Sequence, residues 1–405
     1  MNGRNGTAVA LTMVLEGLGY SIYGAIFGVY LFELKASFTE LALLTAIPNA
    51  TALFLSRFWG IISDESHARK PFILWGKYVA AFFVFIYSLT TNVKEILILF
   101  ILASLITSPA ASPMNAIITS LGGREKRGRS IGLVISASAL GWMLGSFISA
   151  MMVKFLPINY LFILASIILL LSAIIFQIGY KEDVSSYLFS KHIFRIAFNK
   201  AFSFVEFKAD RELFPLIYAM LIYYIGVTLF FHIFGIKYYI VIGRDMSLYA
   251  LVGGISAFFS VIAPPFYGYI SDIIGRDKLL VIMIFVRTIY MIMLTIIWDP
   301  LILTILWVLP IWAGIQVSAR GLATDILGDE RAGRAQGTFS IARNAAAIIG
   351  SITSGILADF LHASENIHNA FPVLLLGIIL CAVSGVIVLI RVVLLRNKVL
   401  HGRIK

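Results

Sequence analysis

The stretch Arg57–Phe72, RFWGIISDESHARKPF, sets two acids and three strong bases between two long apolar runs. A related stretch, PPFYGYISDIIGRDKLL, follows much later in the chain at Pro264–Leu280. Both contain a glycine four residues before an aspartate, and bases follow the aspartate in each. A charged loop that recurs in this way indicates that the chain is built from two related halves.

The composition around these loops is typical of a membrane protein. Of 405 residues, 60% are hydrophobic and 13% are charged, against about 25% charged in a typical soluble domain. An apolar run of about 20 residues can cross the hydrocarbon core as a helix, which satisfies its own backbone hydrogen bonds there. We therefore expect an all-α integral membrane protein with twelve transmembrane helices in two pseudo-symmetric six-helix bundles. The expected spans are 8–34, 41–63, 72–92, 96–119, 130–153, 159–179, 214–241, 247–270, 279–298, 301–326, 335–360 and 370–395.

The basic residues lie mostly on one side of the predicted membrane. An even number of spans puts both termini on the same side, and most lysines and arginines lie in the termini-side segments: Arg69, Lys70, Arg124, Lys126, Arg127, Arg129, Lys181, Lys191, Arg195, Lys200, Lys208, Arg211, Arg276, Lys278, Arg331, Arg334, Arg396, Lys398, Arg403 and Lys405. The opposite side has Lys35, Lys94, Lys154, Lys237 and Arg244. The positive-inside rule then places both termini in the cytoplasm, in a multi-pass protein of the cell membrane. The same asymmetry accounts for the net charge of +11 without a nucleic-acid partner.

The segment 180–213 separates the two sets of six spans. Polar residues recur at helical spacing on one face of it, and apolar residues recur on another. The polar set is His192, Arg195, Asn199, Ser203 and Glu206, and the apolar set is Phe194, Phe198, Phe202 and Val205. This pattern favours an amphipathic helix on the cytoplasmic membrane surface, and a plain tether is the alternative. The expected domains are an N-terminal half, 1–179, a linker, 180–213, and a C-terminal half with a short cytoplasmic tail, 214–405.

The two halves also match in a second place. EKRGRSIGLVISASALGWMLGS (Glu125–Ser146) aligns without gaps on ERAGRAQGTFSIARNAAAIIGS (Glu330–Ser351). The identical pairs include Glu125/Glu330, Gly128/Gly333, Arg129/Arg334, Gly132/Gly337, Gly145/Gly350 and Ser146/Ser351. Glycine and charged residues seldom coincide at fixed offsets by accident. A duplication of six spans is a common construction in secondary transporters, with the transport pathway between the repeats.

Twelve spans, a central linker, two repeated halves and two charged loops resemble the major facilitator superfamily over the whole chain. The family's loop signature is glycine-x-x-x-aspartate-x-x-glycine followed by bases. The second loop fits this signature with Gly268, Asp272, Gly275, Arg276 and Lys278. The first loop keeps Gly60 and Asp64. It departs from the signature in having His67 at the second glycine, Glu65 where a base is usual, and Arg69 and Lys70 shifted by about one position.

The resemblance implies a role for the two aspartates in closing the cytoplasmic side. Asp64 would face the N-terminal end of the span that starts near Arg334, and Asp272 that of the span starting near Arg129. An acid is stabilised at the positive end of a helix dipole, so these contacts would hold the outward-facing state. The alternative is that the loop charges only determine topology. The expected gate residues are Gly60, Asp64, Arg69, Lys70, Gly268, Asp272, Gly275, Arg276, Arg129 and Arg334.

Ionisable residues inside the spans are costly and are therefore candidate functional residues. Glu16, Arg287 and Arg343 each lie about eight residues into a span, roughly 12 Å from its cytoplasmic end at 1.5 Å per residue. Arg320 lies at roughly 9 Å by the same rise, and His232 lies nearer the outer side.

The family resemblance sorts these residues further. It implies that Glu16 and Arg320 face the central cavity, leaves Arg343 and its neighbour Asn344 open, and makes Arg287 peripheral. We expect Glu16 to couple transport to protons beside Arg343 or Arg320, and a structural salt bridge is the alternative. A packing role is favoured for His232 over a proton site. The weaker candidates for polar lining are Asn49, Asn115, Gln316 and Tyr20.

These features favour a secondary transporter that moves a small organic solute by alternating access with proton coupling. The alternatives are a proton-coupled drug or metabolite efflux antiporter and an uncoupled facilitator. Drug/proton antiporters of the superfamily that the chain resembles carry glycine-proline in the fifth span and usually an arginine in the fourth. Here Gly145–Ser146 stands at the first place and span 96–119 has no arginine, which counts against the antiporter without excluding it. The buried arginines favour a solute with an anionic group, unless they pair with Glu16 and helix ends.

Other protein classes would leave different sequence signals. An enzyme would need a metal cluster or a nucleophile beside a base, and HExxH, Gly-x-Ser-x-Gly and phosphate-binding patterns are absent from the sequence. A sensor or an ATP-driven pump would need an additional soluble domain. We therefore expect no enzyme activity, no cofactor and no metal. The expected partners are a small solute, protons and the lipid bilayer, and the expected functional unit is a monomer.

Overall fold

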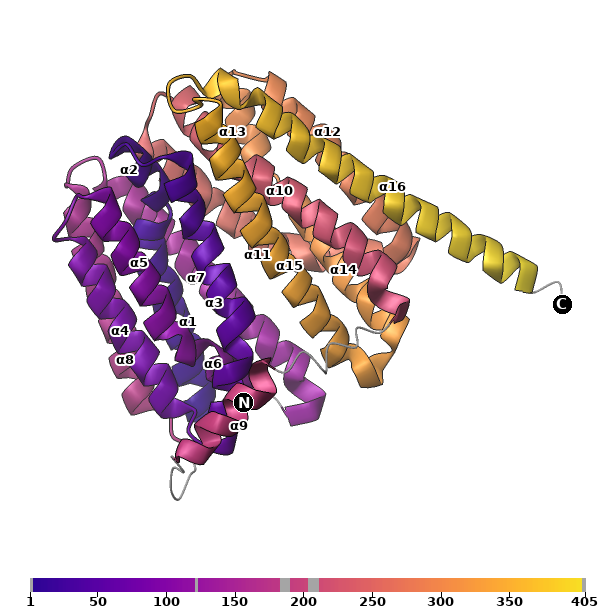
Figure 1. Cartoon of the computed structure of the whole chain (residues 1–405). Helices are drawn as coiled ribbons and strands as arrows, with labels where there is room; N and C mark the ends of the chain where they lie inside the picture. The colour runs from indigo at the N-terminus through magenta and orange to yellow at the C-terminus, as the bar shows by residue number, and fades with distance from the viewer. Residues whose placement is uncertain (1–2, 121–122, 183–189, 203–210, 403–405) are drawn as a thin grey trace. The chain divides into compact units, whose positions relative to one another are not determined.

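The structure is a computed structural model that describes residues 3–120, 123–182, 190–202 and 211–402. Within these ranges every regular element is a helix (Figure 1). Twelve stretches of the described chain are long and apolar enough to cross a membrane, as the hydropathy pattern predicts. The expected all-α fold class and the twelve spans are therefore confirmed, and the chain is a multi-pass membrane protein.

The first half contains eight helices in its described residues. They are α1 (Gly3–Gly24), α2 (Phe27–Glu33), α3 (Phe38–Glu65), α4 (Lys70–Tyr87), α5 (Val93–Thr107), α6 (Ala111–Ser120), α7 (Gly123–Met152) and α8 (Ile158–Gly179). The described helices that follow are α9 (Lys191–Phe202), α10 (Phe214–Val241), α11 (Met246–Ile274), α12 (Arg276–Ile296), α13 (Pro300–Val308), α14 (Ile311–Leu327), α15 (Ala332–Phe360) and α16 (Phe371–Gly402). Short 3₁₀ turns are η1 (Ser108–Ala110), η3 (Arg211–Leu213), η4 (Asp329–Arg331) and η5 (Ile367–Ala370).

Three of the predicted spans consist of two helices each. The span 8–34 is α1 followed by α2, 96–119 is α5 and α6 joined by η1, and 301–326 is α13 followed by α14. Prolines lie at two of these breaks, Pro109 in η1 and Pro310 before α14. Proline has no backbone N–H and its ring crowds the preceding turn, so a helix bends or ends there. The pair Pro264–Pro265 differs, because α11 continues through both.

The chain forms two compact units. Unit 1 consists of Met1–Ala36, Ala50–Glu206 and Asp245–Phe258, and unit 2 consists of Ser37–Asn49, Phe207–Arg244 and Phe259–Lys405. The first residues of α3 thus belong to unit 2, and the first residues of α11 belong to unit 1. The division into domains at 180–213 stays a prediction. By helix packing, the start of α3 belongs with the second unit and the start of α11 with the first, although chain order would place each in the other half.

Polar contacts hold both exchanged segments in place. The Asp359 carboxylate at the end of α15 accepts hydrogen bonds from the backbone N–H groups of Phe38 and Thr39, both at 2.8 Å. These are among the first N–H groups of α3, which have no partner within their own helix. In unit 1, the Ser247 hydroxyl of α11 donates to the Ala150 carbonyl of α7 at 2.6 Å.

The two units repeat the same helix packing. Helix α1 packs against α7 and α8 in unit 1, and α10 packs against α15 and α16 in unit 2. The aligned glycines Gly145 and Gly350 lie at these contacts. A Cβ atom on Gly145 would lie 2.4 Å from the Leu18 carbonyl oxygen, and one on Gly350 would lie 2.7 Å from that of Ile225. The repeated glycines therefore permit the same close approach of two backbones in each unit.

The departure of the first charged loop from the family signature has a conformational explanation. His67 has φ of +52°, and Gly275 at the corresponding place in the second loop has φ of +93°. Both loops turn through a residue with positive φ before the next helix begins. Histidine is tolerated in this region more often than most residues, so His67 can replace the expected glycine.

The predicted amphipathic helix is present in part. Helix α9 covers Lys191–Phe202, while 183–189 and 203–210 lie outside the described residues. Phe194 and Phe198 are exposed on it, and Lys200 forms an ion pair with Glu65 at 3.5 Å. Exposed phenylalanines beside charged residues agree with a helix at a membrane surface.

Candidate functional site

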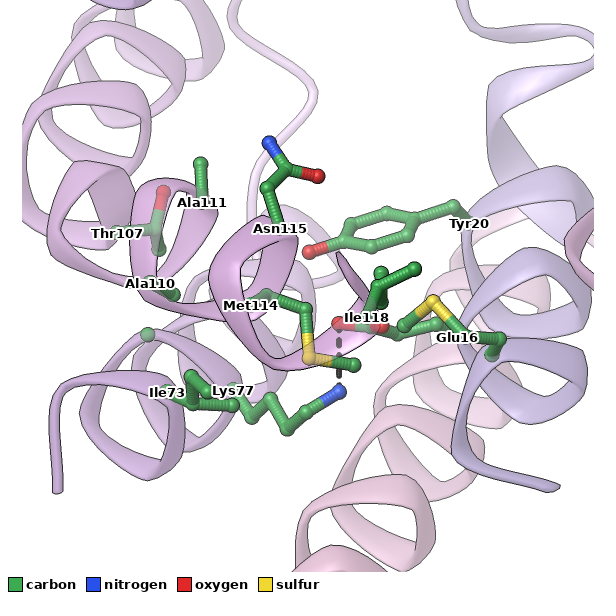
Figure 2. Close-up of a pocket in the computed structure, with 12 residues that line it drawn as sticks. Glu16, Tyr20, Ile73, Lys77, Thr107, Ala110, Ala111, Met114, Asn115 and Ile118 are labelled. Atoms are coloured by element: carbon green, nitrogen blue, oxygen red, sulfur yellow. Dashed lines mark ion pairs between the residues drawn. The ribbon is translucent and has the colours of Figure 1, made fainter. Parts of the chain in front are cut away.

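A pocket of about 340 Å³ with a mixed polar and apolar lining lies in unit 1 between α1, α4 and the broken helix α5–η1–α6 (Figure 2). Five polar side chains line it: Glu16 and Tyr20 from α1, Lys77 from α4, Thr107 from α5 and Asn115 from α6. Their apolar neighbours include Met13 and Met114. The pocket thus brings together three predicted site residues, Glu16, Tyr20 and Asn115.

An ion pair occupies the floor of this pocket. The Lys77 ammonium lies 2.9 Å from the Glu16 carboxylate, and their side chains are 3% and 22% exposed. The ammonium also approaches the Ser172 hydroxyl at 3.5 Å and lies 5.6 Å from the centre of the Phe176 ring. Lys77 is therefore a buried cation whose charge is balanced mainly by Glu16.

The local sequence explains how Lys77 reaches this place. The residue before it, Gly76, lies against η1, where a Cβ atom would meet the Ala110 Cβ at 2.4 Å. The missing side chain lets α4 approach the proline-induced break between α5 and α6. Lys77 follows Gly76 directly on α4 and therefore lies beside the break, where its side chain lines the pocket.

In this pocket, Lys77 is the charged residue that our sequence reasoning missed. We expected Arg343 or Arg320 to supply the positive charge near Glu16, whereas the structure pairs Glu16 with Lys77. The signal was present, because a lysine within the apolar run 72–92 is as costly as the charges that were considered. The two arginines lie in unit 2, on α15 and α14.

Arg320 and Arg343 lie within electrostatic range of each other and of the Tyr224 hydroxyl. The Arg320 guanidinium carbon is 5.8 Å from the centre of the Phe339 ring. Gln316 and Asn344 lie on the same two helices, α14 and α15, and both are partly buried. Unit 2 therefore has its own group of predicted site residues.

Other intramembrane polar residues have packing partners. The guanidinium carbon of Arg287 lies 4.2 Å from the centre of the Phe231 ring and 5.0 Å from that of Tyr290. The His232 ring nitrogen Nε2 hydrogen-bonds the Phe38 carbonyl at 3.0 Å, a contact at the start of α3. The Asn49 amide donates to the Thr45 carbonyl of its own helix at 2.8 Å.

The bases of the two charged loops hold helix ends inside their own units. The Lys70 ammonium donates to the carbonyls of Gln177 and Tyr180, at 2.8 and 2.6 Å, at the C-terminal end of α8. Arg276 donates to the Gly321 carbonyl of α14 at 3.1 Å and pairs with Asp325 at 2.5 Å. Cations are stabilised at the negative end of a helix. These bases therefore have structural roles beyond topology.

The other predicted gate residues vary in their surroundings. Asp64 pairs with Arg69 of its own loop at 3.3 Å, and Gly60 lies so close to α6 that a Cβ atom would be 2.7 Å from the Ser112 hydroxyl. Asp272 and Arg334 are exposed, and a Cβ atom on Gly268 would meet nothing within 4 Å. The side chain of Arg129 lies outside the described residues. A role for these residues in closing the cytoplasmic side stays a prediction.

Comparisons with known proteins agree with this architecture. The family model of the Major Facilitator Superfamily matches residues 9–247 and 219–404. An uncharacterized MFS-type transporter of Methanocaldococcus jannaschii is 23% identical over 367 residues, covering 88% of this chain and 92% of the relative.

Solved structures share the fold at low sequence identity. The crystal structure of a mutant of the nucleoside transporter NupG has a TM-score of 0.75 at 14% identity, with 95% of this chain and 98% of that chain covered. A bacterial homolog to the human lysosomal transporter Spinster, in an inward-facing and occupied conformation, has a TM-score of 0.74 at 11% identity, with 95% of each chain covered. The family match over nearly the whole chain and the twelve helices that carry it show that this chain belongs to the major facilitator superfamily of membrane transporters.

Proposed function

We propose that the chain moves a small organic solute across the cytoplasmic membrane by alternating access, and that it couples this transport to protons through Glu16. The observation that carries the proposal is the ion pair between Glu16 and Lys77 at the pocket of unit 1. The asymmetry of lysine and arginine along the sequence supports cytoplasmic termini in the same proposal.

The pair has the chemistry that a proton carrier requires. A carboxyl group in a medium of low dielectric constant retains its proton, whereas a cation at hydrogen-bond distance favours the carboxylate. Separation of Lys77 from Glu16 would favour proton uptake, and their approach would favour release. If the two steps occur with the pocket open to opposite sides of the membrane, a proton crosses with each cycle.

The rest of the pocket suits a small solute. A volume of about 340 Å³ lies at the lower end of the range for small-molecule sites, roughly 300–1,000 Å³. Tyr20 and Asn115 point toward the same space and offer hydrogen-bonding groups, while Met13 and Met114 supply adaptable apolar surface (Figure 2). The pocket would therefore offer hydrogen-bonding groups and apolar surface beside the residue that carries the proton.

The cytoplasmic gate is a further part of this proposal. The Asp64–Arg69 pair is exposed, and exposed ion pairs contribute only about 0–1 kcal/mol, so Asp64 can exchange this partner for a helix end at low cost. A helix-end contact contributes about 0.3–1 kcal/mol when exposed and up to ~2 kcal/mol when partly buried, enough to shift two near-balanced states severalfold. Asp64→Asn and Asp272→Asn should impair transport more than solute binding and raise cytoplasmic accessibility to thiol probes. Unchanged accessibility in both variants would exclude the gate.

Transport by the purified chain in proteoliposomes tests the function directly. An imposed pH gradient is combined with a panel of labelled sugars, organic acids, amino acids, nucleosides and lipophilic cations. Nucleosides are included because a nucleoside transporter shares the fold. We expect one class to accumulate in response to the gradient, and collapse of the gradient with a protonophore to abolish accumulation. A solute that crosses at the same rate and to the same level with and without the gradient would refute proton coupling.

The direction of proton movement separates the remaining alternatives. A pH-sensitive dye inside the vesicles reports protons that move when the transported solute is added outside. Internal acidification indicates symport and internal alkalinisation indicates antiport. An unchanged internal pH during measurable solute transport indicates a facilitator, which contradicts the role of Glu16.

A further inference from the structure

A second group of polar side chains lies inside unit 2, where Tyr224 of α10, Arg320 of α14 and Arg343 of α15 converge. Phe339 connects them, because the Tyr224 ring packs edge-on against it at 5.9 Å and the Arg320 guanidinium carbon lies 5.8 Å from its centre. Arg343 follows one helical turn after Phe339 on α15. Both arginines lie within electrostatic range of the Tyr224 hydroxyl.

The group lies well inside the membrane-spanning helices. Tyr224 and Arg343 are ten and eleven residues from the first residues of α10 and α15, and Arg320 is seven residues from the last residue of α14. At a rise of 1.5 Å per residue these separations are roughly 10–17 Å. Two neighbouring arginines at this depth repel each other and are expensive to keep away from water.

Neither arginine has its charge balanced within the described residues. No carboxylate pairs with Arg320 or Arg343 in the described part of unit 2, and their guanidinium groups donate no hydrogen bond there. The Nε of Arg320 and the hydroxyl of Tyr224 are both buried without a hydrogen-bond partner in the same described residues. Buried polar groups are nearly always paired, so these two unpaired groups, together with two neighbouring cationic side chains, favour an anionic ligand at this place.

Two other buried cations among the described residues provide a contrast. Lys77 has Glu16 at 2.9 Å. Lys237 donates to three carbonyls at the end of α12, those of Leu294, Thr295 and Ile297, at 2.7, 2.7 and 3.1 Å. These two charges are thus compensated by a carboxylate or by carbonyls. Arg287, whose Nε also has no hydrogen-bond partner among the described residues, packs against two aromatic rings, whereas Arg320 and Arg343 lie within electrostatic range of each other with no carboxylate partner among those residues.

We propose that Tyr224, Arg320 and Arg343 form a site for the anionic group of the transported solute, a carboxylate or a phosphate. A guanidinium presents paired N–H donors that match two oxygens of such a group, and the tyrosine hydroxyl supplies a third donor. The inference rests on the proposed function in taking the bound anion to be the solute that is transported. It names the substrate class as small organic anions.

The chain carries a built-in reporter for a binding experiment. Its single cysteine, Cys381, is buried in α16, so a thiol-reactive fluorogenic dye reports the unfolding of the purified full chain. Matched pairs of probes differ mainly in the acid group: nicotinate and nicotinamide, D-glucuronate and D-glucose, glycerol 3-phosphate and glycerol. We expect at least one charged member to raise the melting temperature while its neutral partner leaves it unchanged.

Variants then locate the effect. The concentration of anion needed for half of the stabilisation should rise about tenfold or more in Arg320→Gln and in Arg343→Gln, because each loses charge-assisted hydrogen bonds. It should rise severalfold in Tyr224→Phe, which keeps the ring. The control Lys154→Gln removes an exposed charge and should leave the value unchanged. If the glutamine variants do not fold, Arg320→Lys and Arg343→Lys keep the charge, lose the paired donors and should still weaken binding severalfold.

Several outcomes would overturn the inference. These are equal stabilisation by the charged and neutral members of every pair, an unchanged anion response in both arginine variants, or stabilisation by phosphatidylglycerol with none by the three small anions. The last outcome would identify the site as one for a lipid headgroup. Binding is measured without a pH gradient, so the two proposals can fail separately. If the purified chain shows no preference for anions but still accumulates solute in response to a pH gradient, only this site is overturned. Retained preference without such accumulation overturns only the proton coupling.

Discussion

Replacing Glu16 by glutamine should show how much of its contribution to stability and transport comes from its negative charge. The substitution keeps the size of the side chain and removes the only carboxylate that the described residues place beside Lys77. At 2.9 Å and an effective dielectric constant of about 20, Coulomb's law gives an attraction of roughly 6 kcal/mol, part of which offsets the desolvation of the two groups. The Lys77 side chain is 3% exposed, so leaving it unpaired should cost about 3–5 kcal/mol.

The double variant Glu16→Gln/Lys77→Met tests whether this cost comes from the unpaired cation. Replacing both members of a buried ion pair by neutral groups of similar size is often neutral for stability. We expect the single variant to melt several degrees below the wild type and the double variant to melt close to it. Glu365→Gln, an exposed carboxylate near the start of α16, serves as the control and should leave the melting temperature unchanged.

The transport assay on the same variants tests the proton role. Both the single and the double variant should lose accumulation driven by a pH gradient and retain solute exchange at equal concentrations on the two sides. A double variant that still concentrates solute in response to the gradient would refute Glu16 as the proton carrier. If the well-folded double variant also loses exchange, Glu16 binds solute or supports packing instead.

Three further predictions concern stability and topology. Asp359→Asn should weaken the two hydrogen bonds to the start of α3 by about 1–2 kcal/mol. Hydrogen exchange should then be faster at the amides of Phe38 and Thr39, and unchanged exchange would contradict this prediction. Lys237→Met should destabilise the fold by about 1.5–3 kcal/mol because the end of α12 loses a charged donor, and an unaltered melting temperature would argue against this role. Single cysteines on a cysteine-free background should be labelled from the cytoplasmic side at Ser186, which lies outside the described residues, and from the outer side at Ser364; labelling of Ser186 only from outside would reverse the proposed topology.

The membrane class and the repeat were readable from the sequence because both depend on local properties. A helix in lipid needs about 20 apolar residues whatever its neighbours are, so hydropathy alone located all twelve spans. Some of the glycines that the two halves share permit the same close approach of two helix backbones in each half, as Gly145 and Gly350 do, and this explains why they coincide when the halves are aligned. Charged loops at matching places then identified the family.

Partners depend on which helices face each other, and that information is not local. The sequence ranked Glu16 as a candidate but could not show that Lys77 of another helix would lie 2.9 Å from it. It also could not show that the start of α3 would pack with unit 2 through Asp359, hundreds of residues away in the chain. Burial makes unpaired charge expensive, so the tertiary structure decides which charges are compensated and which, like those of Arg320 and Arg343, remain for a ligand.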